Sequence, residues 1–146
     1  MTTSGPQFEG FNLVAEDLEA TVAFYGRLGV DIPDEKIWRT ESGAHHTEGV
    51  QIGRDVELEI DSDRLAAVYN AGFTTASRTM LGFRLGSRES VDDLYNDLVA
   101  AGHEGRQPPC DAFWGSRFAI VADPDGRDVS LMSPADGAYR SAPPEI

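Results

Sequence analysis

Cysteine is nearly absent from this sequence, since Cys110 is the only one among 146 residues. A single cysteine cannot form a disulfide within the chain, and it cannot supply the several thiolates of a structural zinc site. Its neighbours Pro108, Pro109 and Asp111 provide no positive charge that would stabilise a thiolate nucleophile. We therefore expect Cys110 to be a structural residue in a reducing compartment.

Positive charge is also scarce. The chain has 12 Lys and Arg residues against 25 Asp and Glu residues, which gives 12 − 25 = −13. A surface with this excess of negative charge repels polyanions, so we expect neither nucleic acid nor an anionic membrane as a partner. A cationic small molecule is compatible with the same charge.

Long hydrophobic runs are missing. No apolar stretch approaches the roughly 18 residues that a membrane span requires, and the first residues show neither part of a secretory signal. We therefore expect a cytoplasmic protein. With 40% apolar and 25% charged residues, the composition is that of one globular domain and not of a disordered or collagen-like chain.

Two segments carry the pattern of amphipathic helices. Asp17 is placed to cap a helix that begins at Leu18 and ends before Gly29. Ser90 is placed to cap a second helix, with apolar residues recurring every three or four positions until Gly102. The two helices have similar lengths, which suggests that they belong to equivalent units.

The spacing of these features indicates an internal duplication. The helix ends differ by 102 − 29 = 73 residues, and the predicted first helical residues, Leu18 and Val91, differ by the same number. Gly-Arg-Asp-Val at 53–56 recurs at 126–129, again 73 residues later, and each copy precedes an alternating strand. Three equal offsets predict two copies of one structural unit.

Each predicted unit has a strand, a helix and then about three strands. The first module is expected at 8–60 and the second at 80–133, with strand-like runs at 8–15, 36–40, 45–52, 56–60, 80–85, 113–121 and 129–132. An extension at 1–7 precedes the first module. The linker at 61–79 is expected to contain a helical turn at 65–69, and the tail at 134–146 is expected to attach loosely.

This arrangement resembles the vicinal oxygen chelate superfamily, the group of glyoxalases, bleomycin resistance proteins and extradiol dioxygenases. The residues that carry the resemblance are the segment Asn12 to Ala20, Phe24-Tyr25, Leu28-Gly29, Ala100 to Gly102, Phe113 to Gly115 and Asp123 to Gly126. The resemblance implies an α+β fold, in which two βαβββ modules form curved mixed sheets around a cup. It also implies a homodimer.

Metal-dependent members of that superfamily hold a divalent ion with His or Glu at four strand positions. The matching positions in this chain are Gly10, Met80, Glu57 and Ser130. Only Glu57 is a ligand for a hard cation, and one carboxylate is too few for a metal site. We therefore expect no metal and no cofactor.

Strand alternation selects the residues that face the cup. Polar, small and methionine side chains share the face that the resemblance assigns to the ligand, and aromatic groups near the strand ends complete it. We expect Arg84 to neutralise Glu57 or Glu59 across this cup. The predicted ligand-binding residues are Asn12, Trp38, Glu57, Glu59, Met80, Arg84, Phe113, Trp114, Ser130 and Met132.

The sequence is compatible with three alternative functions. The first is binding of a small, cationic or aromatic molecule, as in antibiotic sequestration. The second is catalysis, either by a metal-dependent lyase, isomerase or dioxygenase that recruits residues such as His46, or by a metal-free enzyme with Glu57 as general base. The third is a sensory or partner-binding module whose cup is plugged. His46 and Glu48 share a strand face, and we expect a surface position or a hydrogen-bonded edge for them.

Overall fold

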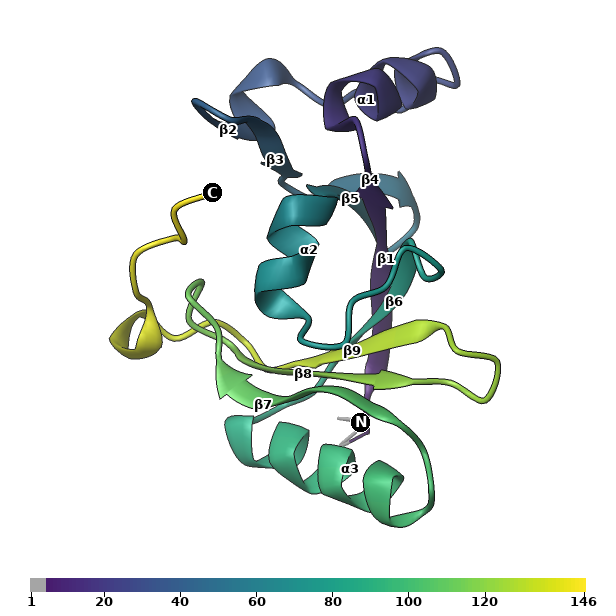
Figure 1. Cartoon of the computed structure of the whole chain (residues 1–146), viewed down its shortest axis with the longest axis vertical. Coiled ribbons are helices and arrows are strands. Elements are labelled where there is room, and N and C mark those ends of the chain that lie inside the picture. The colour runs from purple at the N-terminus through teal and green to yellow at the C-terminus, as the bar shows by residue number, and fades with distance from the viewer. Residues whose placement is uncertain (1–4) are drawn as a thin grey trace.

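One curved sheet organises the molecule (Figure 1). The computed structural model describes residues 5–146. Eight of the nine strands follow the order β2-β3-β5-β1-β6-β9-β8-β7, and the ninth, β4, pairs with β5. The strands are β1 (Gln7–Ala15), β2 (Ile37–Thr40), β3 (Gly43–Thr47), β4 (Val50–Gly53), β5 (Val56–Ser62), β6 (Thr79–Arg84), β7 (Gly105–Asp111), β8 (Arg117–Ala122) and β9 (Asp128–Met132).

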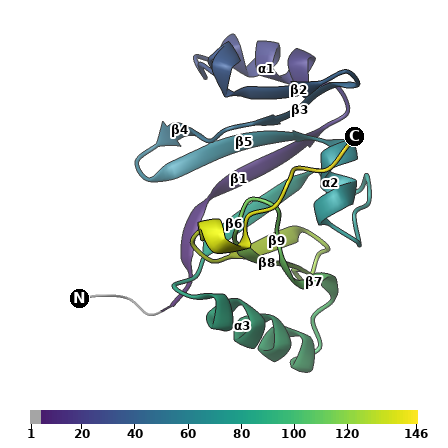
Figure 2. The ribbon, with the colours of Figure 1, turned by 90° about the vertical axis from the view of Figure 1, so that its left-hand side faces the viewer.

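Three helices accompany the sheet: α1 (Leu18–Gly26), α2 (Asp63–Tyr69) and α3 (Arg88–Ala100). Helices α1 and α3 lie at opposite ends of the molecule with the sheet between them, as Figure 2 shows. Two short 3₁₀ turns, Asp34–Lys36 and Gly137–Tyr139, complete the secondary structure. No helix within residues 5–146 has the length and apolar character needed to cross a membrane.

The sheet confirms the predicted fold class and its internal repeat. In the first module β1 pairs in parallel with β5, and in the second β6 pairs in parallel with β9. The two modules meet where β1 and β6 pair antiparallel, with Gly10 opposite Gly82. The first module has one more short strand, β4, than the second. The predicted helical turn in the linker is the last part of α2.

Each module has its own apolar core beneath its helix. Leu18 of α1 packs with Ala15, Ile32 and Ile60, and Val91 of α3 packs with Leu85, Ala119 and Leu131. A third cluster consists of Met80, Ala112, Phe118 and Ile120, and Tyr69 and Trp114 pack against it. Cys110 also packs there and is half-buried, and this burial raises the pKa of its thiol, as suits a structural residue.

Helix α3 begins three residues earlier than predicted, because its cap is Ser87 and not Ser90. The Ser87 hydroxyl accepts a hydrogen bond from the Ser90 amide at 3.1 Å, and the Ser90 hydroxyl accepts one from the Ser87 amide at 3.1 Å. Ser90 is thus the third helical residue of a reciprocal capping box. Both serines fit the pattern, and the sequence alone favoured the wrong one.

The strand prediction fails in one region of the second module. Residues 113–116 form a turn before β8 because Gly115 has a φ of 101°, a conformation outside the strand region. Strand β7 was not predicted, since Pro108 and Pro109 are rare in strands. It lies at the edge of the sheet, where a missing N–H group is tolerated.

The tail at 134–146 is anchored, contrary to the expectation of loose attachment. The Asp136 amide donates to the Gly115 carbonyl at 3.0 Å, and the Ser141 amide donates to the Phe113 carbonyl at 3.0 Å. At its far end the Ile146 carbonyl accepts from the Thr40 hydroxyl at 2.9 Å. The tail therefore connects the second module with the β2–β3 hairpin of the first. Residues 1–4 of the predicted extension lie outside the described residues.

The junction of the two modules generates the first prediction. A Cβ atom added at Gly10 would lie 2.1 Å from the backbone oxygen of Glu57, whereas one at Gly82, directly across the pair, would meet nothing closer than 3.5 Å. We expect Gly10→Ala to destabilise the protein by about 2–3 kcal/mol, since the backbone of β5 must shift. Gly82→Ala is the matched control. Equal denaturant midpoints for the two variants would contradict this reading.

Candidate functional site

The concave side of the sheet contains a cavity of about 600 Å³. Strands of both modules, helix α2, the turn between β7 and β8, and the tail line it. Ligand pockets for small molecules typically measure about 300–1,000 Å³. The cavity therefore has room for a small-molecule ligand.

Strand alternation brings most of the predicted site together. The predicted ligand-binding residues that line the cavity are Asn12, Trp38, Glu57, Glu59, Met80, Phe113, Trp114, Ser130 and Met132. The strand residues among them share a face because residues at even spacing on a strand point the same way, whereas Phe113 and Trp114 reach the cavity from the turn between β7 and β8. That these residues bind a ligand stays a prediction.

Arg84 is the exception, because it does not line the cavity. Its guanidinium forms an ion pair with Glu9 on the neighbouring strand, near the position where Gln7 of β1 lies opposite Arg84. The expectation that Arg84 neutralises Glu57 or Glu59 across the cup is therefore wrong. Its charge is taken up by Glu9 on the adjacent strand.

Asp61 is the centre of a polar network in the wall of the cup. Its side chain is 2% exposed and accepts three hydrogen bonds: from His46 Nδ1 at 2.6 Å, from Asn12 Nδ2 at 3.0 Å and from the Tyr69 hydroxyl at 2.9 Å. The donors come from β3, β1 and α2. A buried carboxylate needs this number of donors to compensate for its lost hydration.

Glu59 lies beside this network with fewer partners. One of its oxygens accepts a hydrogen bond from Asn12 Nδ2 at 3.0 Å. Burial, reinforced by the negative charge of Asp61, raises the pKa of Glu59 from 4.5 to about 7. Glu59 is thus poised to exchange a proton, or to attract a cation, near neutral pH.

His46 is held in one orientation by Asp61. Because the carboxylate accepts, Nδ1 carries the hydrogen, and Nε2 has no hydrogen-bond partner within residues 5–146. Burial lowers the pKa of His46, but the hydrogen bond and charge of Asp61, assisted by Glu59, outweigh burial and raise it above 6.5. An oriented imidazole of this kind suits proton transfer.

Aromatic side chains form the wall contributed by the second module. Trp114 packs edge-to-face against Phe113 and Phe118, with ring centroids 5.1 Å and 5.0 Å apart, and Tyr69 packs against Phe118 at 5.7 Å. The Trp114 indole N–H donates to the sulfur of Met132 at 3.3 Å. Such a wall supplies stacking surface and cation–π contacts.

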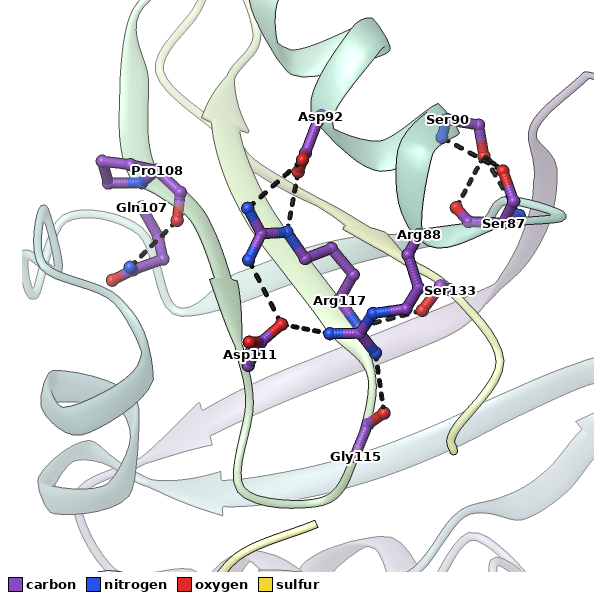
Figure 3. A network of polar contacts seen from close by, with 10 residues as sticks. All are labelled: Ser87, Arg88, Ser90, Asp92, Gln107, Pro108, Asp111, Gly115, Arg117 and Ser133. Atoms are coloured by element: carbon purple, nitrogen blue, oxygen red, sulfur yellow. Dashed lines mark hydrogen bonds and ion pairs between the residues drawn. The ribbon is translucent and has the colours of Figure 1, made fainter. Parts of the chain in front are cut away.

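A charged network outside the cup holds the aromatic turn in place (Figure 3). Arg88, at the start of α3, donates to the Gly115 carbonyl at 3.1 Å and forms an ion pair with Asp111. Arg117 reaches the same Asp111 at 3.2 Å and Asp92 of α3 at 2.8 Å. The turn that carries Phe113 and Trp114 is therefore fixed to helix α3 at its base.

Asp61, Tyr69, His46 and Glu48 line the cavity but were not among the predicted ligand-binding residues. Asp61 continues the alternation of Glu57 and Glu59, but the expected module boundary after Ile60 excluded it. Tyr69 lay in the predicted linker, and its role depends on how α2 folds back over the cup. His46 and Glu48 were expected at a surface or hydrogen-bonded edge, and both line the cavity.

The positions that carry metal ligands in related metalloproteins have no second ligand here. Gly10, Met80 and Ser130 occupy three of them, and the backbone of Glu57 leaves no room for a side chain at Gly10. Within residues 5–146, no group of three or more His, Cys, Asp or Glu side chains is arranged to hold a metal ion. The polar network instead offers proton donors and acceptors.

The family model described as the Glyoxalase/Bleomycin resistance protein/Dioxygenase superfamily matches residues 7–131. The chain belongs to this superfamily. Comparison with functionally curated proteins gives no significant match. The superfamily contains both enzymes and binding proteins, so membership leaves the activity of this chain to be argued from its cup.

Solved structures agree with this fold. A Legionella pneumophila protein described as an NAD-dependent benzaldehyde dehydrogenase aligns with a TM-score of 0.59 at 15% identity, over 85% of this chain and 96% of that one. The 2,3-dioxygenase LapB from Pseudomonas sp. KL28 gives 0.57 at 11%, over 89% of this chain and 43% of its own. A Nocardioides glyoxalase/bleomycin resistance protein/dioxygenase has 27% identity over 99% of this chain and 92% of that one, with a TM-score of 0.39.

The raised pKa of Glu59 generates the second prediction. A carboxyl with a higher pKa in the folded state than the unfolded one binds its proton more tightly when folded, so stability falls as pH rises from about 4.5 to about 7. Glu59→Gln removes the titrating carboxyl, so the variant should not lose this stability as pH rises. We expect the variant to be about 2–3 kcal/mol more stable than wild type at pH 8 and nearly unchanged below pH 4.5.

Chemical denaturation at both pH values measures this difference. Glu41→Gln, which removes one negative charge from an exposed turn, controls for the general effect of net charge. A Glu59→Gln variant that is less stable than wild type at pH 8 would show that the buried carboxylate is compensated in the folded state.

Proposed function

We propose that the protein binds a small cationic molecule with an aromatic or apolar body in its cup, in the manner of antibiotic sequestration. The observation that carries this proposal is Glu59, a partly buried carboxyl beside Asp61 that forms no ion pair with a Lys or Arg side chain within residues 5–146. A ligand cation would supply the missing partner.

The charges around the cavity favour a cation. The acidic residues that line it are Glu9, Glu48, Glu57, Glu59 and Asp61, and the basic ones are His46 and Arg140. Two of the acids already have partners, because Glu9 pairs with Arg84 and Asp61 with His46. The remaining carboxyls attract positive charge, and the apolar walls strengthen that attraction by excluding water.

The apolar part of the cavity favours an aromatic body. Trp38 of the first module and Trp114 of the second both contribute to the wall, together with Met80 and Met132. Indole rings offer large, rigid stacking surfaces, and methionine side chains adapt to irregular shapes. A flat or apolar molecule that carries an amine fits both halves of the cup.

Titration calorimetry with bleomycin-type glycopeptides and simpler cationic aromatics tests this proposal. We expect binding to strengthen as pH rises from 6 to 8, because Glu59 loses a proton over this range and its negative charge then pairs with the ligand. Glu59→Gln should weaken binding about tenfold at pH 8 and flatten the pH dependence.

Glu41→Gln is again the matched control and should leave affinity unchanged. Absence of heat with every cationic aromatic tested would overturn the proposal. Equal affinity for cationic and neutral analogues would show that the acidic wall plays no part.

A second candidate function is metal-free acid–base catalysis, favoured by the pairing of His46 with Asp61. The sequence predicted Glu57 as the general base of such an enzyme. The geometry favours His46, since Asp61 orients its ring through Nδ1 and leaves Nε2 free to take a proton from a bound carbon acid. The protonated carboxyl of Glu59 is a nearby proton donor.

Deuterium incorporation provides a test that needs no knowledge of the product. Aromatic carbonyl compounds incubated with the protein in D₂O should exchange an acidic C–H, detected by NMR, if His46 acts as a base. His46→Asn should abolish this exchange. Metal analysis of protein purified without chelator is the control, because a stoichiometric divalent ion would assign the exchange to the metal-dependent alternative.

A homodimer and a cytoplasmic location remain part of the proposal. Residues from both modules of one chain line the cavity, which supports a cup formed within each chain of the dimer. Dimerisation would therefore affect stability more than the composition of the site.

A further inference from the structure

The tail crosses the open side of the cup between two anchors. Near its start, Tyr139 lies under the Arg88 guanidinium, 3.6 Å from the ring centroid. At its end, the Ile146 carbonyl accepts hydrogen bonds from Thr40 at 2.9 Å and Ser42 at 2.6 Å. Figure 1 shows the tail, in yellow, running from the second module toward β2 and β3 of the first.

The anchors hold Arg140 at the edge of the cavity. Its predecessor Tyr139 is fixed by Arg88, and its successor Ser141 donates its amide hydrogen to the Phe113 carbonyl at 3.0 Å. Arg140, Ser141 and Pro143 are the tail residues that line the cavity. The residues on both sides of Arg140 are therefore held in place, Tyr139 by Arg88 of α3 and Ser141 by the turn that carries Phe113.

Arg140 is the one Lys or Arg side chain among the cavity-lining residues of the described chain. It forms no ion pair with an Asp or Glu of residues 5–146, although carboxyls line the same cavity. The arginines that do form ion pairs are Arg39, Arg84, Arg88, Arg106, Arg117 and Arg127. Arg140 therefore lines the cavity as an exposed residue whose positive charge has no ion-pair partner within residues 5–146.

Guanidinium groups bind carboxylates through paired, planar hydrogen bonds. A group with two negative charges would be repelled more strongly by Glu57 and Glu59 than a carboxylate with one. We propose that Arg140 makes the cup selective for dipolar ligands, with an amine directed to Glu59 and a carboxylate directed to Arg140 across an apolar body. This inference rests on the proposed cation binding and adds the second charged group of the ligand.

Three matched probes separate the two charges: para-(aminomethyl)benzoic acid, its methyl ester and its N-acetyl derivative. The acid carries both charges, the ester only the positive one and the acetylated compound only the negative one. We expect calorimetry at pH 8 to give about tenfold tighter binding of the acid than of the ester, as one charge-assisted contact provides. The acetylated compound should bind more weakly than either.

Arg140→Gln should abolish the preference for the acid, because it weakens binding of the acid and does not weaken binding of the ester. Arg27→Gln, which removes the same charge from an exposed position after α1, should keep the preference. If Arg140→Gln still bound the acid more tightly than the ester at every salt concentration tested, the inference would be overturned.

The outcomes also separate this inference from the proposed function. If the ester binds wild type as tightly as the acid, the dipolar selectivity is wrong and cation binding stands. If neither the acid nor the ester binds, cation binding fails and the selectivity fails with it. An equal loss of acid and ester binding in Arg140→Gln would assign the tail a purely structural role and overturn the inference.

Discussion

The antiparallel pairing of β1 with β6 is the contact on which the rest of the structure depends. Within the described residues it is the pairing that joins the two modules into one sheet. Gly10 lies at its centre, close against the Glu57 backbone, and opposite Gly82. Without this pairing each module would form a small separate sheet, and no cavity would form between the two modules. The cup is a consequence of this junction, since its acidic residues come from the first module and the Phe113–Trp114 turn from the second.

Much of the fold could be predicted because its signals are local or periodic. The repeat of 73 residues identified two equivalent modules, and strand alternation identified most of the cavity wall. The errors arose where long-range contacts decide the outcome. The choice between Ser87 and Ser90 depends on a reciprocal pair of hydrogen bonds, and the partner of Arg84 depends on the pairing of β1 with β6. The anchoring of the tail depends on residues about a hundred positions away, which no local pattern reports.

The site itself combines predictable and unpredictable parts. Glu59 followed from alternation, but its raised pKa arises from burial and from the charge of Asp61, a residue that the sequence placed in a linker. Asp61 in turn is satisfied by three donors from three different elements. This network is costly to build unless every member is paired. The protein therefore retains, next to a fully satisfied carboxylate, one carboxyl that is only partly satisfied, and such local imbalance is characteristic of binding and catalytic sites.

The two prolines of β7 also bear on how copies of the protein can meet. An exposed sheet edge is a template for strand addition, because its unpaired N–H and C=O groups accept another chain. Pro108 and Pro109 have no backbone N–H group, so the β7 edge offers fewer donors to an added strand. The opposite edge, at β2, has no proline between Ile37 and Thr40. The β7 edge is thus a poorer template for an added strand than the β2 edge, so the two ends of the sheet differ in their tendency to aggregate.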